Sequence, residues 1–353
     1  MRETSTMTRA PLKNANRSKA TVHMAGAAEA PMPKGVEPEL PSLAVTPPAG
    51  EDWLHEIKFD GYRILASVDG GRVTLHTRRG NDWTDRIPSL AQALRAIPAK
   101  AALLDGELVS LDERGISSFQ RLQDALGGAP AGTVRLVYFA FDLLYLDGVD
   151  LRGGGLAERK ALLAELLAKV PSPFASTIRL SDHVVGQGPA FFAQAARMGL
   201  EGIVSKRQNA PYRSGRSRTW LKLKCSQRQE LVVVGFTDPK GSRTLLGALL
   251  LATYSGGALV YRGRVGTGFS ERSLRDLHRR LVPLCDRQPV LVQPPTGPEA
   301  RGVHWVKPEL VAEVTFSGFT QDGLLRHSIF LGLREDKAAS DVVLESTAET
   351  SLG

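Results

Sequence analysis

One lysine lies in a segment whose residue types could carry covalent chemistry. Lys58 lies within Glu56-Ile-Lys-Phe-Asp-Gly-Tyr-Arg63. A lysine amine is a nucleophile only when it is neutral, and its ordinary pKa is about 10.4. Neighbouring cations disfavour another positive charge, so Arg63, Lys222 and Lys224 would lower the pKa of Lys58 if the fold gathers them. The short segment alone fits an exposed lysine beside a turn equally well.

Further charged and aromatic residues follow this lysine in a fixed order. They are Thr77-Arg-Arg-Gly80, Asp105-Gly-Glu107, Phe141-Asp142, Glu201-Gly-Ile-Val-Ser-Lys206, Trp220-Leu-Lys-Leu-Lys224 and Leu333-Arg-Glu-Asp-Lys337. One short pattern recurs by chance, but so many patterns in this order do not. The ordered set resembles the covalent nucleotidyltransferase superfamily, which includes ATP-dependent DNA ligases, RNA ligases and mRNA capping enzymes.

Three C-terminal segments narrow the resemblance. They are Gly263-Arg-Val-Gly-Thr-Gly-Phe269, Val303-His-Trp-Val-Lys-Pro-Glu309 and the stretch 322–337. These segments look like the ligase module of bacterial non-homologous end-joining DNA ligases. The resemblance covers about residues 42–340, which leads us to expect a stand-alone minimal DNA ligase that acts in DNA repair.

The resemblance implies that ATP is a co-substrate. Lys58 would attack its α-phosphate, form a lysyl-AMP phosphoramidate and release pyrophosphate. The further residues that the resemblance assigns to the nucleotide are Glu56 and Ile57 at the adenine edge, Phe141 stacked on the adenine, Ile203, Glu107 on the ribose hydroxyls, and Arg63 and Arg78 on ribose or phosphate. A place in the hydrophobic core is compatible with the stacking role of Phe141.

The resemblance also implies a site for phosphate and for Mg²⁺ or Mn²⁺. Lys222 and Lys224 alternate along an expected strand and therefore face one side, where they would neutralise the α-phosphate during transfer. Glu201, together with Glu107, would hold the divalent metal, because magnesium prefers a few carboxylates with phosphate oxygens and water.

The charged segment near the C-terminus is expected to act on the leaving group. Arg334, Asp336 and Lys337 would reach the pyrophosphate when the C-terminal domain closes over ATP. A charge cluster at the end of a helix is the alternative interpretation.

Positive charge predicts a nucleic-acid partner. The formal net charge is +8 and the pI is about 9.6. Residues 201–230 carry eight basic and two acidic side chains, a local net charge of +6. The loop Tyr212-Arg-Ser-Gly-Arg-Ser-Arg218 is expected to contact DNA phosphates through Arg213, Arg216 and Arg218. A solvated loop is the alternative.

The elements that must position these residues alternate between strands and helices. Residues 64–68 and 72–76 predict a hairpin, and residues 102–109, 134–142, 201–206 and 219–224 predict strands. Helical spacing marks residues 89–97, 157–169 and 190–198. After Cys225, short β runs with one helix at 270–281 indicate an oligonucleotide-binding (OB) fold.

The fold class is therefore α+β: a nucleotidyltransferase domain of ATP-grasp-like antiparallel sheets with helices, followed by an OB-fold β-barrel. The expected boundaries are a disordered basic tail at 1–41, an adenylation domain at 42–227, the OB-fold at 228–340 and a flexible tail at 341–353. No apolar run is long enough to span a membrane. We expect a cytoplasmic, nucleoid-associated monomer that binds nicked or broken DNA, with the end-binding protein Ku as a partner implied by the resemblance.

Two other functions remain open from the sequence. An RNA ligase or a capping-type guanylyltransferase would share the lysine and the OB-fold. A non-catalytic nucleic-acid-binding protein on the same scaffold would keep the basic surface but form no nucleotide adduct.

Overall fold

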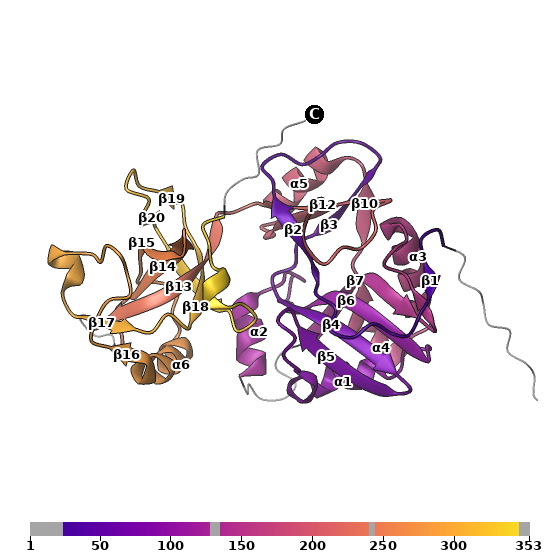
Figure 1. Ribbon diagram of the computed structural model, residues 1–353, viewed down its shortest axis with the longest axis horizontal. Helices are drawn as coiled ribbons and strands as arrows, with labels where there is room; N and C mark the ends of the chain where they lie inside the picture. The colour runs from indigo at the N-terminus through magenta and orange to yellow at the C-terminus, as the bar shows by residue number, and fades with distance from the viewer. Residues whose placement is uncertain (1–23, 128–134, 240–243, 346–353) are drawn as a thin grey trace, which may run out of the picture.

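Two lobes follow one another along the chain (Figure 1). The computed structural model describes residues 24–127, 135–239 and 244–345. The first lobe contains two β-sheets with helices around them, and the second contains one large sheet and helix α6 (Glu271–Leu281). Helix α2 (Phe119–Leu126) belongs to the first lobe and lies between the two lobes in Figure 1.

The largest sheet of the first lobe has the strand order β1-β8-β7-β6-β4-β5, and β9 pairs with β7. The strands are β1 (Ala28–Glu29), β4 (Tyr62–Asp69), β5 (Arg72–Thr77), β6 (Ala101–Ser110), β7 (Leu136–Leu146), β8 (Val149–Asp150) and β9 (Ile178–Leu180). Strand β7 is nearly continuous in apolar residues because it is buried on both faces. Tyr138 joins the main core, whereas Phe141 joins a second cluster on the other face.

The second sheet of this lobe has the order β10-β3-β11-β12-β2. Its strands are β2 (Glu39–Leu43), β3 (Trp53–Ile57), β10 (His183–Val185), β11 (Gly202–Arg207) and β12 (Gly215–Lys224). The side chains of Tyr212 and Trp220 pack with Phe141 of β7, so aromatic residues fill the space between the two sheets.

The helices of the first lobe form where apolar residues recur at helical spacing. They are α1 (Pro88–Leu94), α2, α3 (Leu156–Leu167), α4 (Ser172–Ala175) and α5 (Gly188–Arg197), with the short 3-10 helix η1 (Thr84–Arg86) before α1. The expected hairpin and the three expected helices are confirmed. Helix α2 was not expected; Ser118 caps it by accepting a hydrogen bond from the Arg121 amide.

The second lobe has the expected OB-type composition of short strands and one helix. Its sheet follows β15-β14-β13-β17-β16, with β18 paired to both β13 and β21. The strands are β13 (Arg228–Thr237), β14 (Leu249–Ser255), β15 (Ala258–Val265), β16 (Cys285–Asp286), β17 (Val303–Val306), β18 (Val311–Thr315) and β21 (Ile329–Leu333). A separate pair is β19 (Gly318–Phe319) with β20 (Leu325–Arg326), and the short helices are η2 (Val282–Leu284), η3 (Gly297–Ala300) and η4 (Ala339–Asp341).

The expected closed barrel is not present among the described strands. The sheet ends at β15 on one side. On the other side it ends at both β16, a strand of two residues, and β21. On one edge, β13 pairs first with β18 and then with β17, so this edge is divided between two partners.

Both expected tails are partly structured. Residues 24–41, predicted to be disordered, contribute β1 and the start of β2, and the buried Glu39 accepts hydrogen bonds from Ser217 and Thr219. Pairing of β1 with β8 and of β2 with β12 orders this segment, although its sequence shows no apolar periodicity. Residues 341–345, expected to be flexible, include the fully buried Val342. Residues 1–23 and 346–353 lie outside the described residues.

Within the described ranges, the helices are too short or too polar to cross a bilayer.

Candidate active site

Three neighbouring antiparallel strands bring the predicted lysines and carboxylate to one end of the second sheet. Lys58 directly follows β3, Glu201 directly precedes β11, and Lys224 ends β12. Because β11 runs antiparallel to both β3 and β12, these three chain positions lie at the same end of the sheet. The Lys58 amide donates to the Gly202 carbonyl at 2.9 Å and fixes this register.

Lys58 forms an ion pair with the buried Glu201. Burial lowers the pKa of Lys58, but the carboxylates of Glu201, Glu313 and Asp60 together raise it by more, and the pKa lies above its ordinary value. Our expectation that cations would lower this pKa is therefore wrong for this state. The nearest charge is the carboxylate of Glu201, which stabilises the protonated amine.

Lys222 and Lys224 are brought together as expected, and both form ion pairs with the carboxylate of Glu345. Glu345 Oε1 lies 2.5 Å from Lys222 Nζ, and Glu345 Oε2 lies 2.5 Å from Lys224 Nζ. Burial lowers the pKa of Lys222 to about 8 against the opposing charge of Glu345. Burial alone would raise the pKa of Glu345, but the two lysines lower it to about 2. The lysine pair is thus a two-point anion site.

Arg63 and Glu107 face each other across β4 and β6. Arg63 forms its bidentate ion pair with Asp105, with Nε–Oδ1 at 2.6 Å and Nη2–Oδ2 at 2.5 Å. Burial raises the pKa of Glu107 to about 8, although Arg63 and Lys58 partly oppose this shift. Glu107 is therefore mostly protonated at pH 7, and a protonated carboxyl group can donate a hydrogen bond as well as accept one.

Among the residues predicted to bind adenine, Glu56 and Ile203 are buried and Ile57 is partly exposed. Ile57 and Ile203 are directly paired across β3 and β11. The Glu56 carboxylate accepts hydrogen bonds from Lys160 Nζ at 2.9 Å, Lys206 Nζ at 3.0 Å and the Ser181 hydroxyl at 2.8 Å.

Phe141 has charged neighbours in the cluster between the two sheets. Lys206 Nζ lies 4.2 Å and Arg63 Cζ lies 4.7 Å from its ring centroid. The structure therefore gives Phe141 the core position that the sequence also allowed, and its stacking on adenine stays a prediction.

The C-terminal charged segment follows a strand, so the interpretation as a helix-terminal cluster is wrong. Arg334 directly follows β21 and binds Asp336 in a bidentate ion pair at 2.8 Å. Arg334 Nη1 also lies 3.0 Å from Glu313 Oε2, and Lys337 pairs with Glu230. Burial beside Asp60 and Glu201 raises the pKa of Glu313 to about 7, against the opposing charge of Arg334.

The remaining predicted residues lie on the surface or near it. Arg78 follows β5 and lines a pocket between residues 31–40 and one face of β4 and β5. The exposed side chains of Arg213, Arg216 and Arg218 were assigned to a loop, but β12 already begins at Gly215. Arg216 and Arg218 are two residues apart on this strand, so their side chains point to the same side of it.

Sequence reasoning missed Glu345, Asp105, Glu313 and Lys160 as charged neighbours of this site. Asp105 lies within the segment Asp105-Gly-Glu107, and its acidic type was the available signal. Glu345 carried no signal because it stands in a polar tail more than a hundred residues from its lysine partners.

Models of two protein families match the chain. The ATP dependent DNA ligase domain matches residues 41–224, and the ATP dependent DNA ligase C terminal region matches residues 242–337.

Individual relatives agree with the family models. The multifunctional non-homologous end joining protein LigD of Pseudomonas aeruginosa is 44% identical over 90% of this chain. The Mycobacterium tuberculosis H37Rv protein of the corresponding name is 40% identical over 83%. The chain spans only 38% and 37% of these two relatives.

A solved structure supports the same assignment. Mycobacterial DNA ligase D complexed with ATP and MES is 36% identical, with a TM-score of 0.65, and the match covers 87% of this chain and 98% of that one. This likeness confirms the expected nucleotidyltransferase domain followed by an OB-type domain. The chain belongs to the ATP-dependent DNA ligase family.

Proposed function

We propose that this chain seals breaks with a 5′-phosphate and a 3′-hydroxyl in DNA through a lysyl-AMP intermediate on Lys58. The observation that carries this proposal is the arrangement at the common end of β3, β11 and β12. Lys58 lies there beside Glu201, on the same sheet as Lys222 and Lys224. An amine, a carboxylate and a two-point cation site are the groups that transfer of an adenylyl phosphate requires.

The reaction then consists of three displacements at phosphorus. In the first, Nζ of Lys58 attacks the α-phosphorus of ATP, a P–N bond forms, and pyrophosphate leaves as the amine loses a proton. In the second, a 5′-phosphate oxygen of the DNA attacks the same phosphorus and the P–N bond breaks, which gives a DNA-adenylate. In the third, the 3′-hydroxyl attacks the 5′-phosphate and AMP leaves.

The residues around Lys58 fit a divalent cation. Oε2 of Glu201 is buried and has no hydrogen-bond partner among the described residues, although the other oxygen holds Lys58. A bound Mg²⁺ or Mn²⁺ would supply positive charge that neutralises Glu201 and the ATP phosphates. With Glu201 neutralised, the charge that holds the proton on Lys58 is removed.

Glu107 suits the ribose better than a metal in this arrangement. Its pKa of about 8 makes it a hydrogen-bond donor at neutral pH, which matches a ribose hydroxyl. We retain a second, metal-binding role for Glu107 as part of the proposal, since a nearby cation would favour its ionised form.

The cellular role is proposed from the relatives' printed function, non-homologous end joining. We propose that this chain acts in the same repair process on broken DNA, as a monomer at the nucleoid in the cytoplasm, with Ku as a partner. Pull-down of purified Ku by the chain, with and without a DNA end, tests the partner separately from catalysis.

Ligation of nicked duplex by wild type and Lys58→Ala tests the chemistry. With labelled ATP and Mg²⁺ or Mn²⁺, wild type should form an adduct and seal the nick, whereas Lys58→Ala should do neither. Lys169→Ala, an exposed lysine beyond α3, is the matched control and should behave as wild type. Label transferred from GTP would favour a guanylyltransferase, and the absence of any adduct in wild type would favour a binding-only protein.

A further inference from the structure

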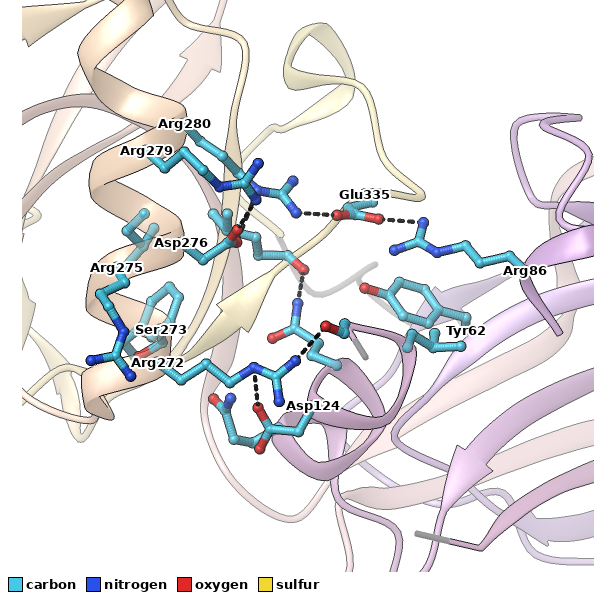
Figure 2. Close-up of a pocket in the computed structure, with 17 residues that line it drawn as sticks. Tyr62, Arg86, Asp124, Arg272, Ser273, Arg275, Asp276, Arg279, Arg280 and Glu335 are labelled. Atoms are coloured by element: carbon cyan, nitrogen blue, oxygen red, sulfur yellow. Dashed lines mark hydrogen bonds and ion pairs between the residues drawn. The ribbon is translucent and has the colours of Figure 1, made fainter. Parts of the chain in front are cut away.

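Helix α2 of the first lobe forms much of the contact with the C-terminal motif on the second lobe. A pocket of about 340 Å³ lies between α2 and α6, and its lining includes Tyr62, Gln123, Leu333 and Glu335 (Figure 2). The proposed chemistry involves no residue of α2. The two lobes therefore meet at a surface that adjoins β21, the strand that Arg334 directly follows.

A hydrogen bond from α2 reaches the backbone of β21. Gln123 Nε2 donates to the Leu333 carbonyl at 2.5 Å. The adjoining Gly332 has no side chain, and a Cβ there would lie 2.1 Å from Gln123 Oε1 and 3.0 Å from the Phe119 ring. The absence of this Cβ permits the close approach of α2 to the strand.

The residue after Leu333 lies over aromatic rings of the first lobe. The Arg334 guanidinium carbon lies 4.7 Å from the Phe119 ring centroid and 5.8 Å from the Tyr62 centroid. Phe119 is the first residue of α2 and Tyr62 is the first residue of β4. Contact with the first lobe thus places the Arg334 guanidinium where α2 and β4 meet the second lobe.

Two ion pairs of Glu335 form a second part of the contact between the lobes. Glu335 lies 2.7 Å from Arg86 of the first lobe and 2.7 Å from Arg280 of α6 (Figure 2). The Arg334 amide donates to the Val311 carbonyl inside its own lobe, at 2.7 Å. The backbone of the motif is therefore fixed to the second lobe. Gln123 and Arg86 contact the motif directly, whereas Arg272 of α6 joins the two lobes beside it, through the Gly127 carbonyl and Asp124.

We propose that Gln123 and Arg86 are positioning residues for lysine adenylation, because they hold the second lobe so that Arg334 faces the ATP phosphates. This inference rests on the proposed function. Pyrophosphate leaves in the first step, so a contact that places a cation on pyrophosphate accelerates that step and not the sealing of a preformed DNA-adenylate. A residue needed only for folding would affect both steps.

Gln123→Met tests the proposal, since methionine keeps the length of the side chain and removes the donor. Loss of one hydrogen bond should lower kcat/KM for lysyl-AMP formation about three- to tenfold. Sealing of a nicked DNA-adenylate without ATP should stay within about twofold of wild type. Gln120→Met, on the same helix and pocket, is the matched control and should leave both rates unchanged.

The outcomes are separable. If wild type forms no adduct and seals no nick, the proposed function fails. If wild type is active and Gln123→Met slows both steps equally or neither step, the positioning role is overturned. If Gln123→Met has a lower melting temperature than wild type by several degrees, Arg86→Met, in the exposed η1, tests the other half of the contact with the same two assays.

Discussion

Glu345 reaches Lys222 from the far end of the chain, with 2.5 Å between Oε1 and Nζ, and its second oxygen holds Lys224. The tail is anchored for this contact. The Glu345 amide donates to Gln229 at 3.2 Å, Gln229 donates to the Val343 carbonyl at 3.1 Å, and Val342 is fully buried. The Glu345 carboxylate thus occupies the position between Lys222 and Lys224 in which the α-phosphate of ATP would bind.

Glu345→Gln is expected to lower the KM for ATP in lysine adenylation about three- to tenfold, because ATP would no longer displace a charged competitor. This range corresponds to about 1 kcal/mol, the upper part of what a partly exposed ion pair contributes. Steady-state adenylation with labelled ATP measures it. Glu271→Gln, an exposed glutamate at the start of α6, is the control. An unchanged KM would show that the contact does not compete with ATP.

The pKa of Lys58 should depend on Glu201. In wild type without metal or ATP, Lys58 should titrate above its ordinary pKa of 10.5, because Glu201, with Glu313 and Asp60, outweighs burial. In Glu201→Gln, burial should dominate and the pKa should fall below the wild-type value. Reductive methylation with a ¹³C label, followed by NMR across pH 7–12, reports this pKa directly. Equal values in the two proteins would contradict the ion pair.

Glu107 should make stability depend on pH. Its folded-state pKa is raised by burial to about 8 from an ordinary value of 4.5. The folded state therefore keeps a proton that the unfolded state has lost, and this stabilising contribution declines as pH rises from about 4.5 to 8. Glu107→Gln does not titrate at this position.

Urea unfolding of wild type and Glu107→Gln at pH 5, 6, 7, 8 and 9 measures that difference. The free energy of unfolding of wild type relative to the variant should fall between pH 5 and 8 and level off above. A difference of one pH unit between the folded and unfolded pKa values corresponds to about 1.4 kcal/mol. A constant difference in unfolding free energy across this range would mean that Glu107 is ionised in the folded protein.

Arg216 and Arg218 should contribute to the salt dependence of DNA binding. Each phosphate contact adds about 0.9 to the slope of log affinity against log salt, so Arg216→Ala with Arg218→Ala should reduce its magnitude by about 2. Fluorescence anisotropy with nicked duplex, without ATP or metal, measures the slope. Arg95→Ala, an exposed arginine that follows α1, should leave it unchanged. Equal slopes for the double variant and wild type would exclude these phosphate contacts.

A deletion that tests whether the basic N-terminal segment contributes to DNA binding should end before residue 24, where the described structure begins. Removing residues 1–40 would take away β1 and the first two residues of β2, including the buried Glu39, which joins β2 to β12. The result would report folding as well as DNA binding. A deletion ending at residue 23 would keep the described structure.

The sequence by itself determined the family, the ligase-type order of motifs and most strands. Residue type and strand alternation are local properties, so the sequence alone places Lys222 and Lys224 on one face of a strand. The direction of the Lys58 pKa was decided only by tertiary structure, because a pKa depends on charges and burial through space. The roles of Glu345 and of α2 were also invisible, since their partners lie more than a hundred residues away and in a different lobe.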